Sequence, residues 1–221
     1  MLLRSALILL LSVAPALANP WPRDTSGTFI AITEDFSDTD DTGETSLFIE
    51  SGGGRTGFSI GVSSVLDEVS DEWSAFAFVR QPLTASGARD RVSLSAGFGA
   101  QHTDAGETEP LVILGGAWGR DVEGRMAGWL SLEGQARYAT DTGSTELQGD
   151  ATVAVQPMER IALVNELSLS GVPVSDVDAD AQLTSSIVGS ISDQARIQLG
   201  ATVDLSGDAA TGFRLGTWLE F

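Results

Sequence analysis

The sequence predicts an all-β fold: a single antiparallel transmembrane β-barrel of about twelve strands, with ten strands as the alternative. Apolar and polar residues alternate along segments of about eight to twelve residues from Thr28 to Phe221, and a period of two is typical of strands. Gly, Asp, Ser, Thr and Pro separate these segments, as expected of turns. No uninterrupted apolar stretch after Ala18 approaches the roughly 20 residues of a membrane helix. If the chain crosses lipid, it must therefore do so as a closed barrel, which satisfies its own backbone hydrogen bonds.

The first 18 residues have the features of a secretory signal peptide. Arg4 is the one charged residue there, and the apolar run from Leu7 to Val13 is too short to span a bilayer. Ala16-Leu17-Ala18 forms a small-x-small cleavage site. We predict a removable signal peptide at 1–18, a short periplasmic lead at 19–27 and the barrel at 28–221, with an uncleaved anchor as the alternative.

The predicted strands differ in how clearly they show two faces. They cover residues 28–36, 45–51, 56–65, 72–80, 91–101, 111–119, 126–139, 145–156, 160–170, 179–190, 195–206 and 212–221. Their lengths suit membrane strands of about 9–11 residues joined by short turns. Alternation is clearest in the second half. In 28–36, 73–80 and 111–118 both faces carry apolar side chains, so these strands cannot be assigned an inner and an outer face.

The charge balance and the absence of cysteine narrow the possible functions. The chain has 31 acidic and 12 basic residues, all of the latter arginine, for a formal net charge of −19. Phosphate binding needs a basic surface, so nucleic acid is not expected as a partner. With no cysteine there are no disulfides or thiolate metal sites, and we expect no cofactor and no resident metal.

The charges of the connections favour twelve strands. If both chain termini lie in the periplasm, the connections alternate between the two sides of the membrane. The outer set is rich in Asp and Glu and contains no Arg, whereas the inner set and its edges hold Arg55, Arg89, Arg91, Arg120, Arg125 and Arg160. A wrong strand count would tend to mix the two sets.

A secreted soluble sandwich or lipocalin-like barrel is the alternative fold, because it also has alternating strands. A soluble barrel encloses its apolar face, whereas a membrane barrel presents that face to lipid. Charged residues at strand centres favour the membrane barrel, as do the many small residues in the apolar set. The central charges include Glu133, Arg137, Asp150 and Glu166.

The polar face of the strands supplies the candidate functional residues. We predict that the lumen holds Glu133, Arg137, Glu146, Asp150, Glu166, Arg196, Asp204 and Arg214. Opposite charges on paired strands attract, so Arg137 is expected to pair with Asp150 or Glu146. Such a lumen is either a narrow polar pore for small solutes or ions, or a space plugged by its own ion pairs. Because acids exceed arginines, a conducting pore is expected to prefer cations.

Catalysis finds less support in the sequence. The single histidine, His102, is followed by Thr103 and Asp104, without the serine two residues away that lipid-hydrolysing outer-membrane barrels carry. A nucleophilic serine needs a base within hydrogen-bond reach. We therefore expect His102 to be a loop histidine and name no catalytic residue.

The connections and the aromatic residues suggest two further roles. The acidic connections could bind divalent cations at the cell surface, although their spacing does not match an EF-hand. They contain Asp38, Asp40, Asp41, Glu44, Asp104, Glu107, Glu109, Asp176, Asp178 and Asp180. Aromatic residues near strand ends are expected to form girdles at the membrane interfaces. These are Trp73, Trp118, Trp129, Tyr138 and Trp218.

The signal peptide, the alternating strands and the ending Leu215-Gly216-Thr217-Trp218-Leu219-Glu220-Phe221 together resemble small Gram-negative outer-membrane β-barrels of the porin-like kind. The specific element of this resemblance is the last strand. The resemblance implies a place in the outer membrane, contact with its lipid and lipopolysaccharide, and recognition of the last strand by the outer-membrane assembly machinery. The implied assembly signal consists of Phe213, Leu215, Leu219 and Phe221.

The function expected from the sequence is a narrow porin-like channel or a structural barrel. A lipid-modifying enzyme and a surface-binding barrel that uses its acidic loops are the alternatives.

Overall fold

The computed structural model of the protein contains twelve strands and describes residues 27–37, 43–52, 59–67, 72–85, 88–103, 106–124, 126–171, 180–206 and 210–221. The strands are β1 (Thr28–Ser37), β2 (Gly43–Gly52), β3 (Ser59–Asp67), β4 (Trp73–Pro82), β5 (Asp90–His102), β6 (Thr108–Val122), β7 (Ala127–Ala139), β8 (Thr145–Met158), β9 (Ile161–Gly171), β10 (Asp180–Ser190), β11 (Ala195–Asp204) and β12 (Thr211–Glu220). Among the described residues, no helix is long and apolar enough to cross a membrane.

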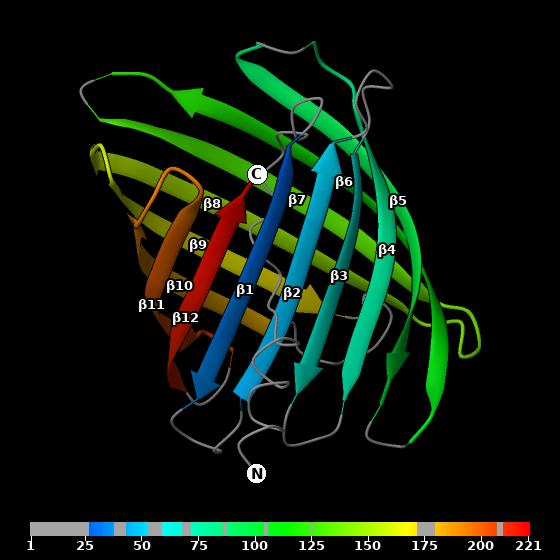
Figure 1. The fold of residues 1–221 in the computed structure, drawn as a ribbon. Coiled ribbons are helices and arrows are strands. Elements are labelled where there is room, and N and C mark those ends of the chain that lie inside the picture. The colour runs from blue at the N-terminus through cyan, green and yellow to red at the C-terminus, as the bar shows by residue number, and fades with distance from the viewer. Residues whose placement is uncertain are drawn as a thin grey trace.

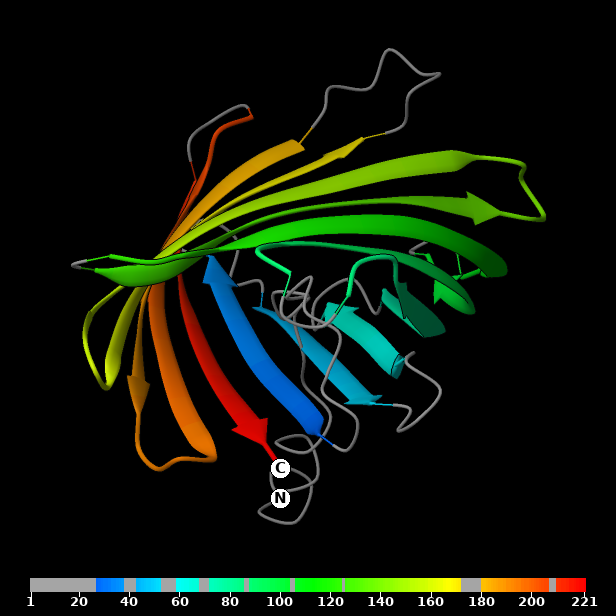
Figure 2. The same ribbon diagram turned by 90° about the horizontal axis from the view of Figure 1, so that it is seen from above.

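The strands form one closed antiparallel barrel in which each strand pairs with its neighbours in sequence (Figures 1 and 2). The closure joins the first and last strands, with Phe29 opposite Glu220 and Phe36 opposite Phe213. Thr28 and Phe221 exchange two backbone hydrogen bonds of 2.9 Å at the seam. The terminal end of the barrel, where β1 begins and β12 ends, is at the top of Figure 1. The opposite end is called the far end below.

The twelve strands and their antiparallel order confirm the predicted fold class. Each predicted boundary lies within about three residues of the observed one. The largest consequence of a shift is at β6, which begins at Thr108 rather than at Leu111. Glu109, which the sequence placed in an acidic loop, is therefore buried on the inner face of a strand and accepts a hydrogen bond from Gln101 at 3.1 Å.

Outward-facing side chains are large and apolar, which distinguishes this barrel from a soluble one. Phe98, Leu114 and Leu199 are 73%, 61% and 59% exposed. A soluble barrel would bury such residues, whereas a membrane barrel presents them to lipid. The outer surface therefore matches the predicted membrane barrel rather than the soluble alternative.

The residues along β12 show how one strand serves both faces. Phe213 and Leu215 are exposed on the outside, whereas Arg214 and Trp218 are buried on the inside. Leu219 shares the outward parity of Phe213 and Leu215, and Phe221 follows the strand with 62% of its surface exposed. The predicted sides of this strand are those seen in the structure.

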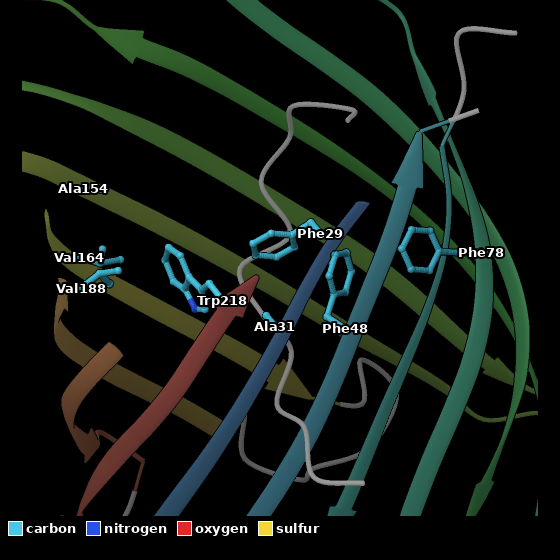
Figure 3. Packing of buried hydrophobic residues seen from close by; sticks show 8 residues of the cluster. All are labelled: Phe29, Ala31, Phe48, Phe78, Ala154, Val164, Val188 and Trp218. Atoms are coloured by element: carbon cyan, nitrogen blue, oxygen red, sulfur yellow. The ribbon is translucent and has the colours of Figure 1, made fainter. Parts of the chain in front are cut away.

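An apolar cluster lines the lumen toward the terminal end (Figure 3). Its members come from β1, β2, β4, β8, β9, β10 and β12, and each lies within about five residues of the strand end that is nearest the termini. They are Phe29, Ala31, Phe48, Phe78, Ala154, Val164, Val188 and Trp218. This apolar cluster explains why β1 and β4 carry apolar residues on both faces: one set meets the outside and the other fills the lumen.

Two of the five residues expected at membrane interfaces lie elsewhere. Trp218 belongs to the apolar cluster, and Trp129 packs against it, so the prediction that these two residues form a girdle is wrong. Both are inward-facing by strand parity, and the apolar lumen offers them a packed site. Trp73 and Tyr138 are exposed on the outer face near the far end, and Trp118 shares the outward parity nearer the terminal end.

A glycine makes the aromatic part of this cluster possible. The rings of Phe48 and Phe78 stack with centroids 5.6 Å apart, although β3 lies between their strands. Gly61 of β3 is the register partner of Phe78. A Cβ atom at Gly61 would lie 2.2 Å from Phe78 Cζ, so only a residue without a side chain lets the ring lie across β3.

Candidate functional site in the barrel lumen

The lumen contains two cavities among the described residues. The wider one, here called the vestibule, measures about 440 Å³ and opens among the far-end residues of β1–β3 and β8–β12. Its walls hold six acidic side chains and one basic side chain, Arg214. The acids are Asp35, Glu44, Asp67, Glu166, Asp180 and Asp204.

The second cavity, here called the central chamber, measures about 90 Å³ and is lined by residues of β2 to β9. Apolar groups, among them Phe48, Phe76 and Ile113, form one part of its wall. The rest of the wall is polar, and its charged members are Arg80, Arg137, Glu133, Asp150 and Glu166. Gln148 and Glu166 line both cavities, so the central chamber adjoins the vestibule at these two side chains.

Arg214 ties three strands together where the cavities meet. Its Nε and Nη2 atoms donate to the two carboxylate oxygens of Asp35 at 2.7 and 2.9 Å. Its Nη1 atom donates to Oε1 of Glu166 at 3.1 Å. Asp35 lies on the adjacent β1, whereas Glu166 lies on β9, three strands away in barrel order. The arginine therefore links β1 and β9 through the lumen, and all three groups are largely buried.

Arg80 makes a second link from β4. Its guanidinium lies 3.7 Å from Glu50 and 3.6 Å from Glu133, and it sits over the Phe78 ring at 5.7 Å from the centroid. Glu50 is fully buried and accepts a hydrogen bond from Ser59. A buried carboxylate is tolerated only when it is paired and hydrogen-bonded, and Arg80 and Ser59 provide this for Glu50.

Arg137 pairs with Glu146 rather than with Asp150. The Nη1 atom of Arg137 lies 4.0 Å from Oε2 of Glu146, its register partner on β8. Its guanidinium lies over the Phe76 ring at 5.5 Å, and the amide oxygen of Gln135, in the orientation that satisfies both of its atoms, accepts from it at 3.2 and 2.9 Å. Asp150 instead stands opposite another acid, Glu133.

The eight candidate lumen residues all have inward parity in the structure. Of these eight residues, Glu133, Arg137, Asp150 and Glu166 line the central chamber. Glu166, Asp204 and Arg214 line the vestibule. Glu146 and Arg196 line neither cavity. Arg196 lies at the terminal end, 3.7 Å from Glu220.

Sequence reasoning missed three charged residues that prove central. Asp35 and Arg80 come from β1 and β4, where both faces carry apolar residues and the sequence pattern does not assign the sides, and Glu50 comes from β2. The usable signal was the charge itself, since a charged residue among apolar neighbours in a membrane strand faces the lumen.

His102 lines neither cavity, whereas Glu44 and Asp180 of the acidic connections line the vestibule. His102 stacks on Trp73 with ring centroids 6.1 Å apart, and its Nδ1 atom forms a hydrogen bond of 2.9 Å with Thr108. Among the described residues, no group of three or more His, Cys, Asp or Glu side chains is placed to hold a metal ion. Asp38, Asp40, Asp41, Asp104, Asp176 and Asp178 lie outside the described residues, as do positions 1–18 of the expected signal peptide.

Several solved structures of outer-membrane porins have a backbone fold similar to that of this barrel. The KdgM porin is 12% identical, with a TM-score of 0.59 over 87% of this chain and 99% of that chain. The NanC porin is 9% identical, with a TM-score of 0.62 over 86% and 98% of the two chains. This chain has the fold of an outer-membrane porin.

A third structure extends the likeness to nearly the whole chain. An outer membrane channel of Pseudomonas putida F1 is 11% identical, with a TM-score of 0.62 over 94% of this chain and 100% of that chain. No protein-family model and no curated protein matches the sequence. At these identities the likeness concerns the path of the backbone, so the porin fold is shown by structure while the lumen chemistry has to be read from this chain's own residues.

Proposed function

We propose that this protein is a narrow porin-like channel of the bacterial outer membrane that favours cations over anions. The observation that carries the proposal is the pair of adjoining lumen cavities, which meet at Gln148 and Glu166 and whose charged lining residues are mainly acids. Such a path gives a charged or polar solute a continuous set of polar partners from the far end to mid-height in the barrel.

The outer-membrane location rests on the outer surface and on the fold. Exposed apolar side chains surround the barrel on the outside, and the backbone follows that of outer-membrane porins. The expected signal peptide and the last strand, ending in Phe221, agree with this location. The terminal end then faces the periplasm and the vestibule opens to the cell exterior.

The preference for cations follows from the vestibule walls. Six acids face one arginine there, and rings of acidic side chains attract cations and repel anions. One KdgM structure contains oligogalacturonate, which is a polyanion. The same solute would meet repulsion at the vestibule of this chain, so the shared fold is expected to serve a different class of solute here.

Planar-bilayer recordings with the purified, folded protein test the proposal. With a tenfold KCl gradient across the bilayer, the reversal potential should have the sign of a channel that passes K⁺ more readily than Cl⁻. A barrel that is well inserted but carries no current would contradict the channel, and a reversal potential of the opposite sign would contradict the preference for cations.

Two Glu→Gln substitutions distinguish the effect of a charge in the lumen from the effect of a charge on the outside of the barrel. Glu44 lines the vestibule, whereas Glu34 lies at a similar height on the adjacent strand with outward parity. Glu44→Gln should move the reversal potential toward zero, and Glu34→Gln should leave it unchanged. Equal effects of the two variants would show that the vestibule acids do not set the selectivity.

A further inference from the structure

Within the proposed channel, the central chamber has more acidic groups than its arginines can satisfy. Glu133 on β7 is the register partner of Asp150 on β8, and like charges directly opposite one another on a sheet repel. Glu166 on β9 pairs in register with Thr152, which places it diagonally next to Asp150. Three neighbouring strands therefore present three carboxylates to the same small space.

The arginines of the chamber are already committed to other groups. Arg80 is shared between Glu50 and Glu133, and Arg214 is shared between Asp35 and Glu166. Arg137 is held by Glu146 and Gln135. Any further positive charge that reaches the three carboxylates must therefore come from outside the described part of the protein.

Three buried polar atoms of the chamber wall lack a hydrogen-bond partner and show where such a group would bind: Oε1 of Glu133, Oγ of Ser93 and Oε2 of Glu166. Oε2 of Glu166 has no hydrogen-bond partner although its side chain is only 7% exposed, and Oγ of Ser93 has none at 1% exposure. Buried polar atoms are almost always hydrogen-bonded, because leaving one unpaired is unfavourable. The three residues line the central chamber, from β7, β5 and β9. A ligand that donates several hydrogen bonds would satisfy them.

The chamber also limits the chemistry of that ligand. The described residues place no group of three or more metal-binding side chains together, so a bare divalent cation lacks a ready coordination site. The phenyl rings of Phe48 and Phe76 and the side chain of Ile113 form an apolar wall beside the acids. The volume is about one fifth of that of the vestibule, which suits a small solute.

We propose that the central chamber binds a primary ammonium group on a short alkyl chain, with the ammonium at Glu133, Asp150 and Glu166 and the chain against Phe48, Phe76 and Ile113. A primary ammonium has three donors, and the chamber wall offers it several carboxylate and hydroxyl acceptors. Its alkyl chain gains by leaving water for the apolar wall. The inference rests on the proposed channel only in that the solute enters through the vestibule.

Two measurements with n-butylammonium chloride as the probe test this site. In planar bilayers, the probe added on the vestibule side should reduce the K⁺ current in a saturable way. Calorimetric titration of the folded barrel in detergent measures binding without any need for conduction. Binding without any ion current would contradict the proposed channel and leave the site standing, whereas current without saturable binding would overturn the site alone.

Three variants assign the binding to the chamber. Asp150→Asn, which removes no ion pair that the structure shows, should weaken n-butylammonium binding about tenfold, or 1.4 kcal/mol. Glu166→Gln should weaken it at least as much, provided that the barrel still migrates as a folded species on unheated gels. Glu109→Gln removes a lumen acid outside both cavities and should leave binding unchanged.

The alternatives give different results. If Mg²⁺ binds with the same dependence on Asp150 and n-butylammonium does not, the chamber is a metal site and the proposal is wrong. If glycine, a zwitterion, binds as tightly as n-butylammonium, the arginines contribute to recognition and the assignment to a cation is wrong. Unchanged binding in Asp150→Asn would also overturn it.

Discussion

Arg214 and Glu166 lie three strands apart in barrel order and are joined across the lumen by a hydrogen bond of 3.1 Å. The same guanidinium binds Asp35 through two further hydrogen bonds. One side chain of the last strand therefore links β1 at the seam of the barrel to β9, at the point where the vestibule and the central chamber meet.

Arg214→Met should destabilise the barrel by about 3 kcal/mol, because it leaves two largely buried carboxylates without their partner. Unfolding in urea, followed by tryptophan fluorescence on the barrel refolded in detergent, measures this change. Arg196→Met is the matched control on the adjacent strand. Its pair with Glu220 is more than 40% exposed, so its loss should cost no more than about 1 kcal/mol. Equal losses in the two variants would contradict a special role for the cross-lumen link.

Gly61→Ala should destabilise the barrel by about 1–3 kcal/mol through overpacking. The added Cβ would lie 2.2 Å from Phe78 Cζ and 2.7 Å from the carbonyl oxygen of Ile49. Gly149→Ala is the control, since its Cβ would meet nothing closer than 3.7 Å, and it should change stability by less than about 0.5 kcal/mol.

A double variant checks the cause of the Gly61 effect. Combining Gly61→Ala with Phe78→Leu removes the ring atoms that clash, so the two substitutions together should cost less than the sum of their separate effects. Strict additivity, measured by the same urea unfolding, would show that the ring of Phe78 is not what requires a glycine at this position.

The sequence predicts this barrel well wherever the lumen is polar. In β7, β8 and β12 the charged inward residues differ chemically from their outward neighbours, as Arg214 differs from Phe213 and Leu215. Alternation alone then gives the strand, its faces and the charges of the lumen. The eight candidate lumen residues all come from β7–β12 for this reason.

Strands β1, β2 and β4 show where that reasoning ends. Phe29, Phe48 and Phe78 face inward while apolar residues also face outward, so alternation carries no information about the side. Asp35 pairs with Arg214, which lies at the other end of the sequence. Glu50 and Arg80 pair across the intervening β3, whose Gly61 is the register partner of Glu50. Such contacts depend on the stagger of the strands around the closed barrel. The alternation of residues within one strand gives no information about this stagger.

Trp218→Ala should increase the single-channel conductance in planar bilayers. Trp218 packs against Phe29 in the apolar cluster near the terminal end, and apolar constrictions limit conduction by excluding water. Removing the indole opens this part of the lumen, at a cost in stability of about 3–5 kcal/mol. Trp218→Phe should give a smaller increase.

Trp73→Ala provides the control for this measurement, because Trp73 lies on the outer face near the far end. It should leave conductance unchanged. If Trp218→Ala inserts as a folded barrel and its conductance also stays unchanged, the apolar cluster does not set the resistance of the lumen, and the narrowest point must lie among the charged side chains of the central chamber.

We propose that the last strand acts as the assembly signal, so deletion of Phe221 should reduce the amount of barrel in the outer membrane more than it reduces the stability of the folded protein. Phe221 contributes two backbone hydrogen bonds to Thr28 and a ring that is 62% exposed. Losing this seam pairing should cost about 1–3 kcal/mol in unfolding, since the rest of the β1–β12 ladder is kept.

The two effects are measured separately. Fractionation of cells followed by unheated gels gives the folded protein in the outer membrane, and urea unfolding of the refolded variant gives its stability. Leu83→Ala removes an exposed apolar side chain next to β4 and should change neither quantity appreciably. If deletion of Phe221 left the outer-membrane yield unchanged while stability fell, the residue would serve the seam of the barrel and not its recognition during assembly.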